Sequence, residues 1–198
     1  MHHIYKTRAI ILKSWPSKEA NKNLLLLTKD LGVLYATVQG ARKIESKMRQ
    51  SIQDYSVADV ALISARAGWK LINVSFISNF YSSVSSELST ALIRVFSLIC
   101  KLVAGEIEDN DLFKLVDDFI TLAIKYDKRL DSELIKSFEV IMTARLLFIL
   151  GYFEKEKVAH FLEGDINMNL LKELESNKEI SRRGLIQEIN RSITESEL

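Results

Sequence analysis

The sequence predicts an α+β protein whose all-β half, a small five-stranded barrel, precedes an all-α half. Apolar residues recur with a period of two, or in short unbroken runs, up to residue 80, and with a period of 3.6 beyond it. Charge divides in nearly the same way, since residues 1–70 hold 12 Lys/Arg against 5 Asp/Glu and residues 71–198 hold 15 against 21. We therefore expect two domains, one at 1–80 and a helical one at 81–198.

Five strands are expected in the first half. They cover residues 6–13, 23–28, 33–39, 55–64 and 71–80. The second strand is a continuous leucine run, which indicates burial on both faces, and the third alternates apolar and polar residues. Ser14-Trp15-Pro16-Ser17 interrupts the first strand, and a long basic loop at 40–53 follows the third. Short strands joined by tight turns and one long loop are typical of a small closed barrel such as an OB-fold.

The second half is expected to be a helical bundle. An apolar stripe from Leu88 to Leu102 marks the first long helix, and Asp111–Ile124 and Ser132–Leu150 mark two more. Residues 138–150 are apolar on nearly every side, so the third helix should lie at the centre of the bundle, and Gly151 should end it. The remaining residues predict two or three short amphipathic helices.

The sequence carries no signature of catalysis, metal binding or membrane insertion. It lacks a Walker-type phosphate loop, a G-x-S-x-G motif and an H-E-x-x-H motif. Cys100 is the only cysteine, which excludes an intrachain disulfide and a multi-cysteine zinc site. No apolar run has the length of a membrane span, and the first residues lack the apolar stretch of a secretory signal. We therefore expect a non-enzymatic protein of the cytoplasm, with no metal, cofactor, small-molecule substrate or membrane partner.

Cations concentrate in the first half, as a polyanionic partner requires. Phosphate binding depends on spread, flexible cations, because each neutralised phosphate releases counterions, and single-strand binding adds aromatic platforms for the bases. The aromatic candidates are Trp15, Tyr35, Tyr55 and Trp69. An ordinary solvated basic surface over core aromatics is the alternative. The predicted DNA-binding residues are Lys6, Arg8, Lys13, Lys18, Lys22, Tyr35, Arg42, Lys43, Lys47, Arg49, Arg66 and Lys70.

Several motifs in the chain fall at spacings that occur together in one protein family. They are Tyr5–Lys13, Glu19-Ala20, Leu27-Thr28, Gly32, Val38–Lys43, Ser46–Arg49, Gln53 and Tyr55-Ser56, with Ala144–Leu147 and Leu150–Tyr152 as a weaker match in the second half. On these residues the sequence resembles the RecO family of bacterial recombination mediator proteins. The resemblance implies an N-terminal OB-fold followed by a helical domain.

The resemblance also implies a function in DNA repair and, with it, association with the nucleoid. It implies binding to single- and double-stranded DNA, annealing of complementary strands, and cooperation with RecR and single-stranded-DNA-binding protein in loading the RecA recombinase. Many members of the family carry a four-cysteine zinc element soon after the Leu-Gly-Tyr step. This chain continues instead through Phe153-Glu154-Lys155-Glu156, without a cysteine, so the resemblance implies a variant without the zinc element.

Arg145 lies within the most apolar predicted helix, and a buried Arg needs a partner. One interpretation is an internal ion pair with Glu139 or Asp118. The other is an anion receptor beside an apolar groove, and the resemblance points to the acidic, Phe-ended tail of single-stranded-DNA-binding protein as its ligand. Three functions stay open: a DNA-annealing mediator, an OB-fold RNA-binding module, and a protein-interaction adaptor without annealing activity.

Overall fold

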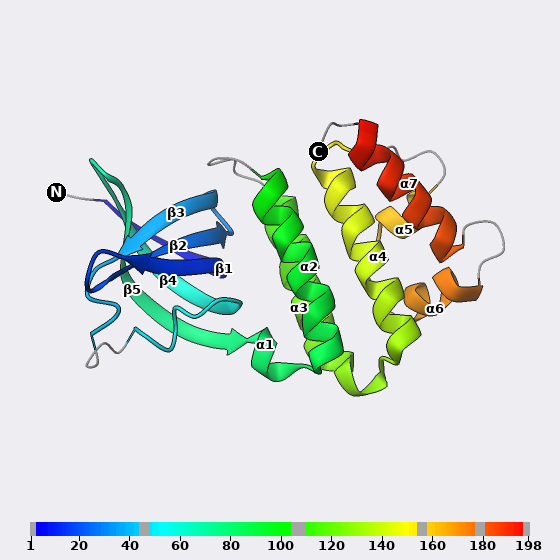
Figure 1. Cartoon of the computed structure of the whole chain (residues 1–198), viewed down its shortest axis with the longest axis horizontal. Coiled ribbons are helices and arrows are strands. Elements are labelled where there is room, and N and C mark those ends of the chain that lie inside the picture. The colour runs from blue at the N-terminus through cyan, green and yellow to red at the C-terminus, as the bar shows by residue number, and fades with distance from the viewer. Residues whose placement is uncertain (1–2, 44–47, 104–109, 154–157, 177–180, 196–198) are drawn as a thin grey trace. The chain divides into compact units, whose positions relative to one another are not determined.

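The chain folds as five strands followed by helices, in a computed structural model that describes residues 3–43, 48–103, 110–153, 158–176 and 181–195. The strands form a closed barrel in the order β1-β2-β3-β5-β4 (Figure 1). Neighbouring strands pair antiparallel, except that β3 and β5 pair in parallel over a short stretch. This order and closure confirm the predicted OB-fold. The strand bounds are β1 Ile4–Ser17, β2 Asn21–Thr28, β3 Gly32–Val38, β4 Ser56–Ala65 and β5 Gly68–Asn79.

The first strand is longer than the sequence predicts, and the expected break at Ser14–Ser17 is wrong. β1 pairs with β4 over Ile4–Ile10 and with β2 over Ala9–Ser17, so its second half has a strand partner on one side only. Pro16 lies in this one-sided stretch, where its missing N–H can face away from the ladder. Trp15 consequently lies on a strand that is paired with β2, rather than in a loop.

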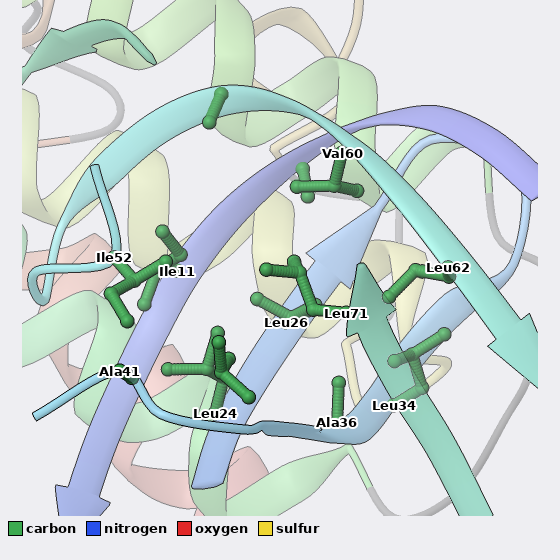
Figure 2. Close-up of a cluster of buried hydrophobic side chains, with 13 residues drawn as sticks. Ile11, Leu24, Leu26, Leu34, Ala36, Ala41, Ile52, Val60, Leu62 and Leu71 are labelled. Atoms are coloured by element: carbon green, nitrogen blue, oxygen red, sulfur yellow. The ribbon is translucent and has the colours of Figure 1, made fainter. Parts of the chain in front are cut away.

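Apolar side chains from all five strands fill the barrel (Figure 2). Leu24 and Leu26 of β2 point inward, opposite Ala36 and Leu34 of β3, while Ile52 enters from the loop that precedes β4. The whole leucine run of β2 is at most 6% exposed, which confirms the predicted burial on both faces. Since side chains alternate along a strand, the inward leucines also determine which residues of β1, β2 and β3 face outward.

The three long helices lie close to their predicted positions, and α4 is at the centre of its bundle. It contacts α2, α5, α6 and α7. The carboxylate of Asp131 accepts a hydrogen bond from the Leu134 amide at 2.9 Å and so caps the start of α4. No helix within the described ranges is long and apolar enough to cross a membrane. The helix bounds are α1 Phe80–Ser83, α2 Ser86–Leu102, α3 Asn110–Tyr126, α4 Ser132–Ile149, α5 Ala159–Leu162, α6 Met168–Ser176 and α7 Arg182–Glu195, with a 3₁₀ turn η1 at Asp127–Arg129.

The chain forms two compact units. The barrel unit combines Met1–Ser83 with Val103–Phe113, and the helical unit combines Val84–Leu102 with Lys114–Leu198. Each unit therefore draws on two stretches of the chain. A functional boundary between residues 80 and 81 stays a prediction.

Candidate nucleic-acid interface

The register of three neighbouring strands brings aromatic and cationic side chains to one outer face of the barrel. Lys13, Leu25 and Tyr35 are direct neighbours across β1, β2 and β3. Because Leu24 and Leu26 point into the core, these three side chains must point outward. Tyr35 is 64% exposed, so its ring is available to a ligand.

The next row of the same face adds Trp15, Asn23 and Thr37, which are also direct neighbours across the three strands. The rings of Trp15 and Tyr35 meet edge to face, with their centroids 6.1 Å apart. The Thr37 hydroxyl donates a hydrogen bond of 3.1 Å to the Asn23 side-chain carbonyl, which ties β3 to β2. The two aromatic rings thus lie side by side above a hydrogen-bonded sheet.

Lys70 extends this surface onto β5, because it pairs with Thr37 where β3 and β5 run in parallel. A cation therefore lies on either side of the two rings, Lys13 on β1 and Lys70 on β5. We call the surface formed by Lys13, Trp15, Asn23, Tyr35, Thr37 and Lys70 the aromatic face. Such a combination of stackable rings and flanking cations suits a single nucleic-acid strand, whose bases stack and whose phosphates are neutralised.

Two turns at one end of the barrel bring further cations together. The backbone amide of Arg42 donates to the carbonyl of Ala20 at 3.0 Å, and its guanidinium donates to the carbonyl of Lys18 at 3.4 Å. Gly40 begins the second turn with a φ of +65°, a conformation that favours glycine, and its amide donates to the Asn21 side chain at 3.1 Å. Arg42 thus holds the turn after β3 against the turn between β1 and β2.

The exposed cations of these turns, Lys18, Arg42 and Lys43, form what we call the loop end. It is continuous with the aromatic face, because β1 runs directly from Trp15 to the turn that contains Lys18. Arg49 is exposed in the segment that follows. Lys47, also predicted to bind DNA, lies outside the described residues.

Lys22 has an internal role that the sequence did not suggest. Its ammonium donates hydrogen bonds to the Ser14 hydroxyl at 3.0 Å and to the carbonyl of Ile52 at 3.5 Å. Ile52 is fully buried in the barrel core. The side chain of Lys22 therefore ties β1 and the loop before β4 to the start of β2, and the geometry favours this structural role over a phosphate contact.

Lys6, Arg8 and Arg66 lie outside the aromatic face. Lys6 and Arg8 are on the part of β1 that pairs with β4, and the Arg8 guanidinium is 3.5 Å from the carboxylate of Asp59. Arg66 occupies the exposed turn between β4 and β5. The partly neutralised Arg8 makes this second group of cations a weaker candidate surface.

Of the four aromatic candidates, Trp15 and Tyr35 share the aromatic face, and the other two pack elsewhere. Trp69 meets Tyr5 edge to face at 5.1 Å and packs against the barrel core. The Tyr55 ring is 5.2 Å from that of Phe80. Asn23 and Thr37 were not predicted as site residues, although Thr37 follows Tyr35 by two positions and strand alternation alone puts it on the same face.

Arg145 is buried, but its partners are neither of the two predicted carboxylates. Its guanidinium donates to the backbone carbonyls of Phe161, Glu163 and Gly164 at 2.8–2.9 Å. Glu139, which we expected as its partner, instead binds Arg94 at 2.8 Å.

Burial lowers the pKa of the Arg145 guanidinium from its ordinary value, while the negative charges of Asp165 and Asp118 act to raise it. Asp118 therefore influences Arg145 through its charge only. With 5% of Arg145 exposed and each of its nitrogens donating to the backbone, the geometry favours a structural role over direct contact with a partner's carboxylate.

The residues that the structure describes contain no group of three or more His, Cys, Asp and Glu side chains that could hold a metal ion. The site that the structure does offer is the aromatic face with the loop end.

The closed five-stranded barrel with this outer face defines a basic OB-fold protein of the kind that binds nucleic-acid strands. Residues 1–79 match the family described as "Recombination protein O N terminal". The barrel of this chain belongs to the RecO family.

Among its relatives, "DNA repair protein RecO" of Clostridium novyi (strain NT) is 32% identical over 161 residues, which are 78% of this chain and 59% of the relative. The protein of the same name from Gloeothece citriformis (strain PCC 7424) is 29% identical over 61% of this chain and 43% of the relative. That of Dehalococcoides mccartyi (strain ATCC BAA-2266 / KCTC 15142 / 195) is 30% identical over 58% of this chain and 46% of the relative. The chain thus spans about half the length of the curated relatives it matches.

Proposed function

We propose that the chain is a non-catalytic DNA-binding mediator of recombinational repair, which anneals complementary single strands and helps to load a recombinase onto coated single-stranded DNA. The observation that carries the proposal is the outward-facing Trp15–Tyr35 pair between Lys13 and Lys70, continuous with the cations of the loop end. Its relatives are DNA repair proteins by name.

The chemistry of the aromatic face supports binding of single strands without sequence preference. Base stacking on an aromatic ring contributes about 1–3 kcal/mol per base, and every base has a face that can stack. Cations at the loop end would neutralise phosphates, which also suits the backbone of a duplex. A strand held through its phosphates and base faces keeps its hydrogen-bonding edges free, and this leaves it competent to pair with a complement.

The proposal is tested by replacing both rings, as Trp15→Ala/Tyr35→Ala, and measuring single-strand binding and strand annealing. We expect binding to weaken at least about tenfold, since the variant removes both stacking platforms. The matched control is Phe76→Ala/Tyr81→Ala, which removes two exposed rings of the same unit that are 50% and 58% exposed. Equal binding by the wild type and the Trp15/Tyr35 variant would contradict the proposal. Binding of RNA without annealing would favour the RNA-binding module, and no binding of either nucleic acid would favour the adaptor.

Two protein partners are proposed, a RecR-type protein and the tail of single-stranded-DNA-binding protein. The proposal of a RecR-type partner rests on the family resemblance alone. A groove of about 390 Å³ between α4 and α7 supports the second partner. Val140, Ile186 and Ile189 supply apolar lining for an aromatic side chain. Lys136 and Arg182 also line the groove, and they would bind the acidic residues of the peptide in exchange for Glu133, the carboxylate that both of them hold. This groove, rather than Arg145, is the place where such a peptide would fit.

Ile186→Asp should abolish binding of an acidic, Phe-ended peptide and leave DNA binding unchanged. Unchanged peptide binding would contradict this assignment.

A further inference from the structure

A cationic patch lies at the C-terminal end of α3, within the helical unit. Lys125 and Tyr126 end the helix, and Lys128 and Arg129 lie in the 3₁₀ turn η1 that follows. The Lys125 ammonium is 5.1 Å from the centroid of the Tyr126 ring, and the Arg129 guanidinium carbon is 5.9 Å from it. Three cations and one aromatic ring thus share a five-residue segment of a half of the chain in which acidic residues outnumber basic ones.

The three cations are exposed, and within the described ranges no carboxylate lies at salt-bridge distance from them. The two nearest carboxylates in the sequence, Asp127 and Asp131, are both engaged by backbone amides at the starts of helices. Asp127 accepts from the Ser85 amide at 2.7 Å, just before α2, and Asp131 caps α4. The positive end of each helix offsets these negative charges, so the solvent-facing side of the segment is cationic.

We infer that Lys125, Tyr126, Lys128 and Arg129 bind the phosphate backbone of a second nucleic-acid strand while the aromatic face holds the first. The inference rests on the proposed function, because annealing brings two polyanions to one protein. Neutralising phosphates on both strands reduces the repulsion between them and raises the local concentration of the complement. Cations that contact an aromatic ring have less freedom to lose when they meet phosphates, and the ring can also receive a base.

The test replaces the three cations in the full-length chain, as Lys125→Gln/Lys128→Gln/Arg129→Gln, and measures two quantities. The first is the affinity for one labelled single strand at limiting DNA, and the second is the rate at which the protein anneals that strand to its complement. We expect the affinity to stay within about twofold of the wild type and the annealing rate to fall at least about fivefold. The matched control, Lys114→Gln/Lys172→Gln/Arg183→Gln, removes the same charge from exposed positions of the helical unit and should anneal like the wild type.

The inference would be overturned if the Lys125/Lys128/Arg129 variant annealed DNA at the wild-type rate. It would also be overturned if the control variant lost as much annealing activity, because net charge rather than the patch would then be the cause. A variant that anneals normally but loses binding of an acidic protein would overturn it in favour of a protein partner. Photocrosslinking of 5-iodouracil-substituted DNA to the wild-type protein gives a second readout if the variant misfolds, and the inference requires an adduct at Tyr126. Different results would contradict the proposed function itself. They are a wild-type protein that binds no single strand, or a Trp15→Ala/Tyr35→Ala variant that binds single strands normally.

Discussion

The loop end of the barrel unit and Arg145 of the helical unit use positive charge in opposite ways. The cations of the loop end are exposed, so a polyanion can reach them. In the helical unit, Arg145 is buried and binds three backbone carbonyls. Arg145 is also the one charged side chain that is buried among the residues described. A Lys or Arg in the sequence therefore indicates a ligand-binding surface only once its burial and its hydrogen-bond partners are known.

The largest effect on stability is expected from removing Arg145, whose guanidinium binds three backbone carbonyls within the helical unit. Arg145→Ala leaves the carbonyls of Phe161, Glu163 and Gly164 without their charged donor, and each hydrogen bond to a charged group contributes about 1.5–3 kcal/mol. We expect the free energy of unfolding to fall by about 3 kcal/mol or more, measured by urea denaturation. The control Arg94→Ala, which breaks an exposed ion pair with Glu139, should cost less than about 1 kcal/mol. A similar small loss in both variants would mean that Arg145 does not hold the 161–164 segment.

The second prediction sharpens the description of the barrel surface. Arg42→Ala/Lys43→Ala should weaken single-strand binding, and the log–log salt slope should shrink by about 0.7 for each phosphate that is no longer neutralised, or about 1.4 in total. Lys6→Ala/Arg8→Ala removes the same number of charges but should change the slope less, because Arg8 faces Asp59. The slopes come from titrations of a labelled strand at several salt concentrations. A larger change in the Lys6/Arg8 variant would move the DNA path from the loop end to the β1–β4 side.

A third prediction separates structural from ligand-binding cations within the barrel. Lys22→Met keeps the aliphatic part of the side chain but removes the donor to Ser14 and Ile52. The expected outcome is a loss of about 2 kcal/mol in unfolding free energy, since two hydrogen bonds of about 1 kcal/mol each are removed, with an unchanged salt slope for DNA binding. If the slope shrinks while stability is unaffected, Lys22 belongs to the DNA interface after all.

The smallest expected effect concerns acid stability of the helical unit. Hydrogen bonds from Lys136 and Arg182 lower the pKa of Glu133 from 4.5 to about 2. A carboxyl whose pKa is lower in the folded state stabilises the fold above its unfolded pKa, and this contribution is lost as the pH falls from about 4.5 towards 2. Because Glu133 is exposed, the effect is small, and we expect the urea midpoints of wild type and Glu133→Gln to differ slightly at pH 5 and to converge as the pH approaches 2. A difference that does not change with pH would exclude this linkage.

Local pattern predicted most of the fold. The leucine run of β2, the alternation of β3 and the stripes of the long helices all reflect side chains that the nearest elements bury, so a few residues of sequence suffice to recognise them. The extension of β1 past Pro16 was missed because its one-sided pairing depends on where β4 begins, which no local pattern reveals.

The candidate site was predictable only in part, for the same reason. Tyr35 and the cations of the loop end could be named from composition, but their grouping with Trp15 depends on strand register. The inward turn of Lys22 and the three carbonyl partners of Arg145 involve backbone groups distant in sequence. Backbone carbonyls have no sequence signature, because every residue carries one.

The central claim, that a single strand stacks on the aromatic face, is tested most directly by the fluorescence of Trp15. The chain has two tryptophans, so Trp69→Phe leaves Trp15 as the only one. Titration of this variant with oligothymidylate should quench the emission of Trp15 in a saturable manner, with a midpoint that rises with salt and matches the midpoint of labelled-DNA anisotropy. Saturable binding by anisotropy with unchanged Trp15 emission would contradict the claim, because the strand would then bind elsewhere on the protein.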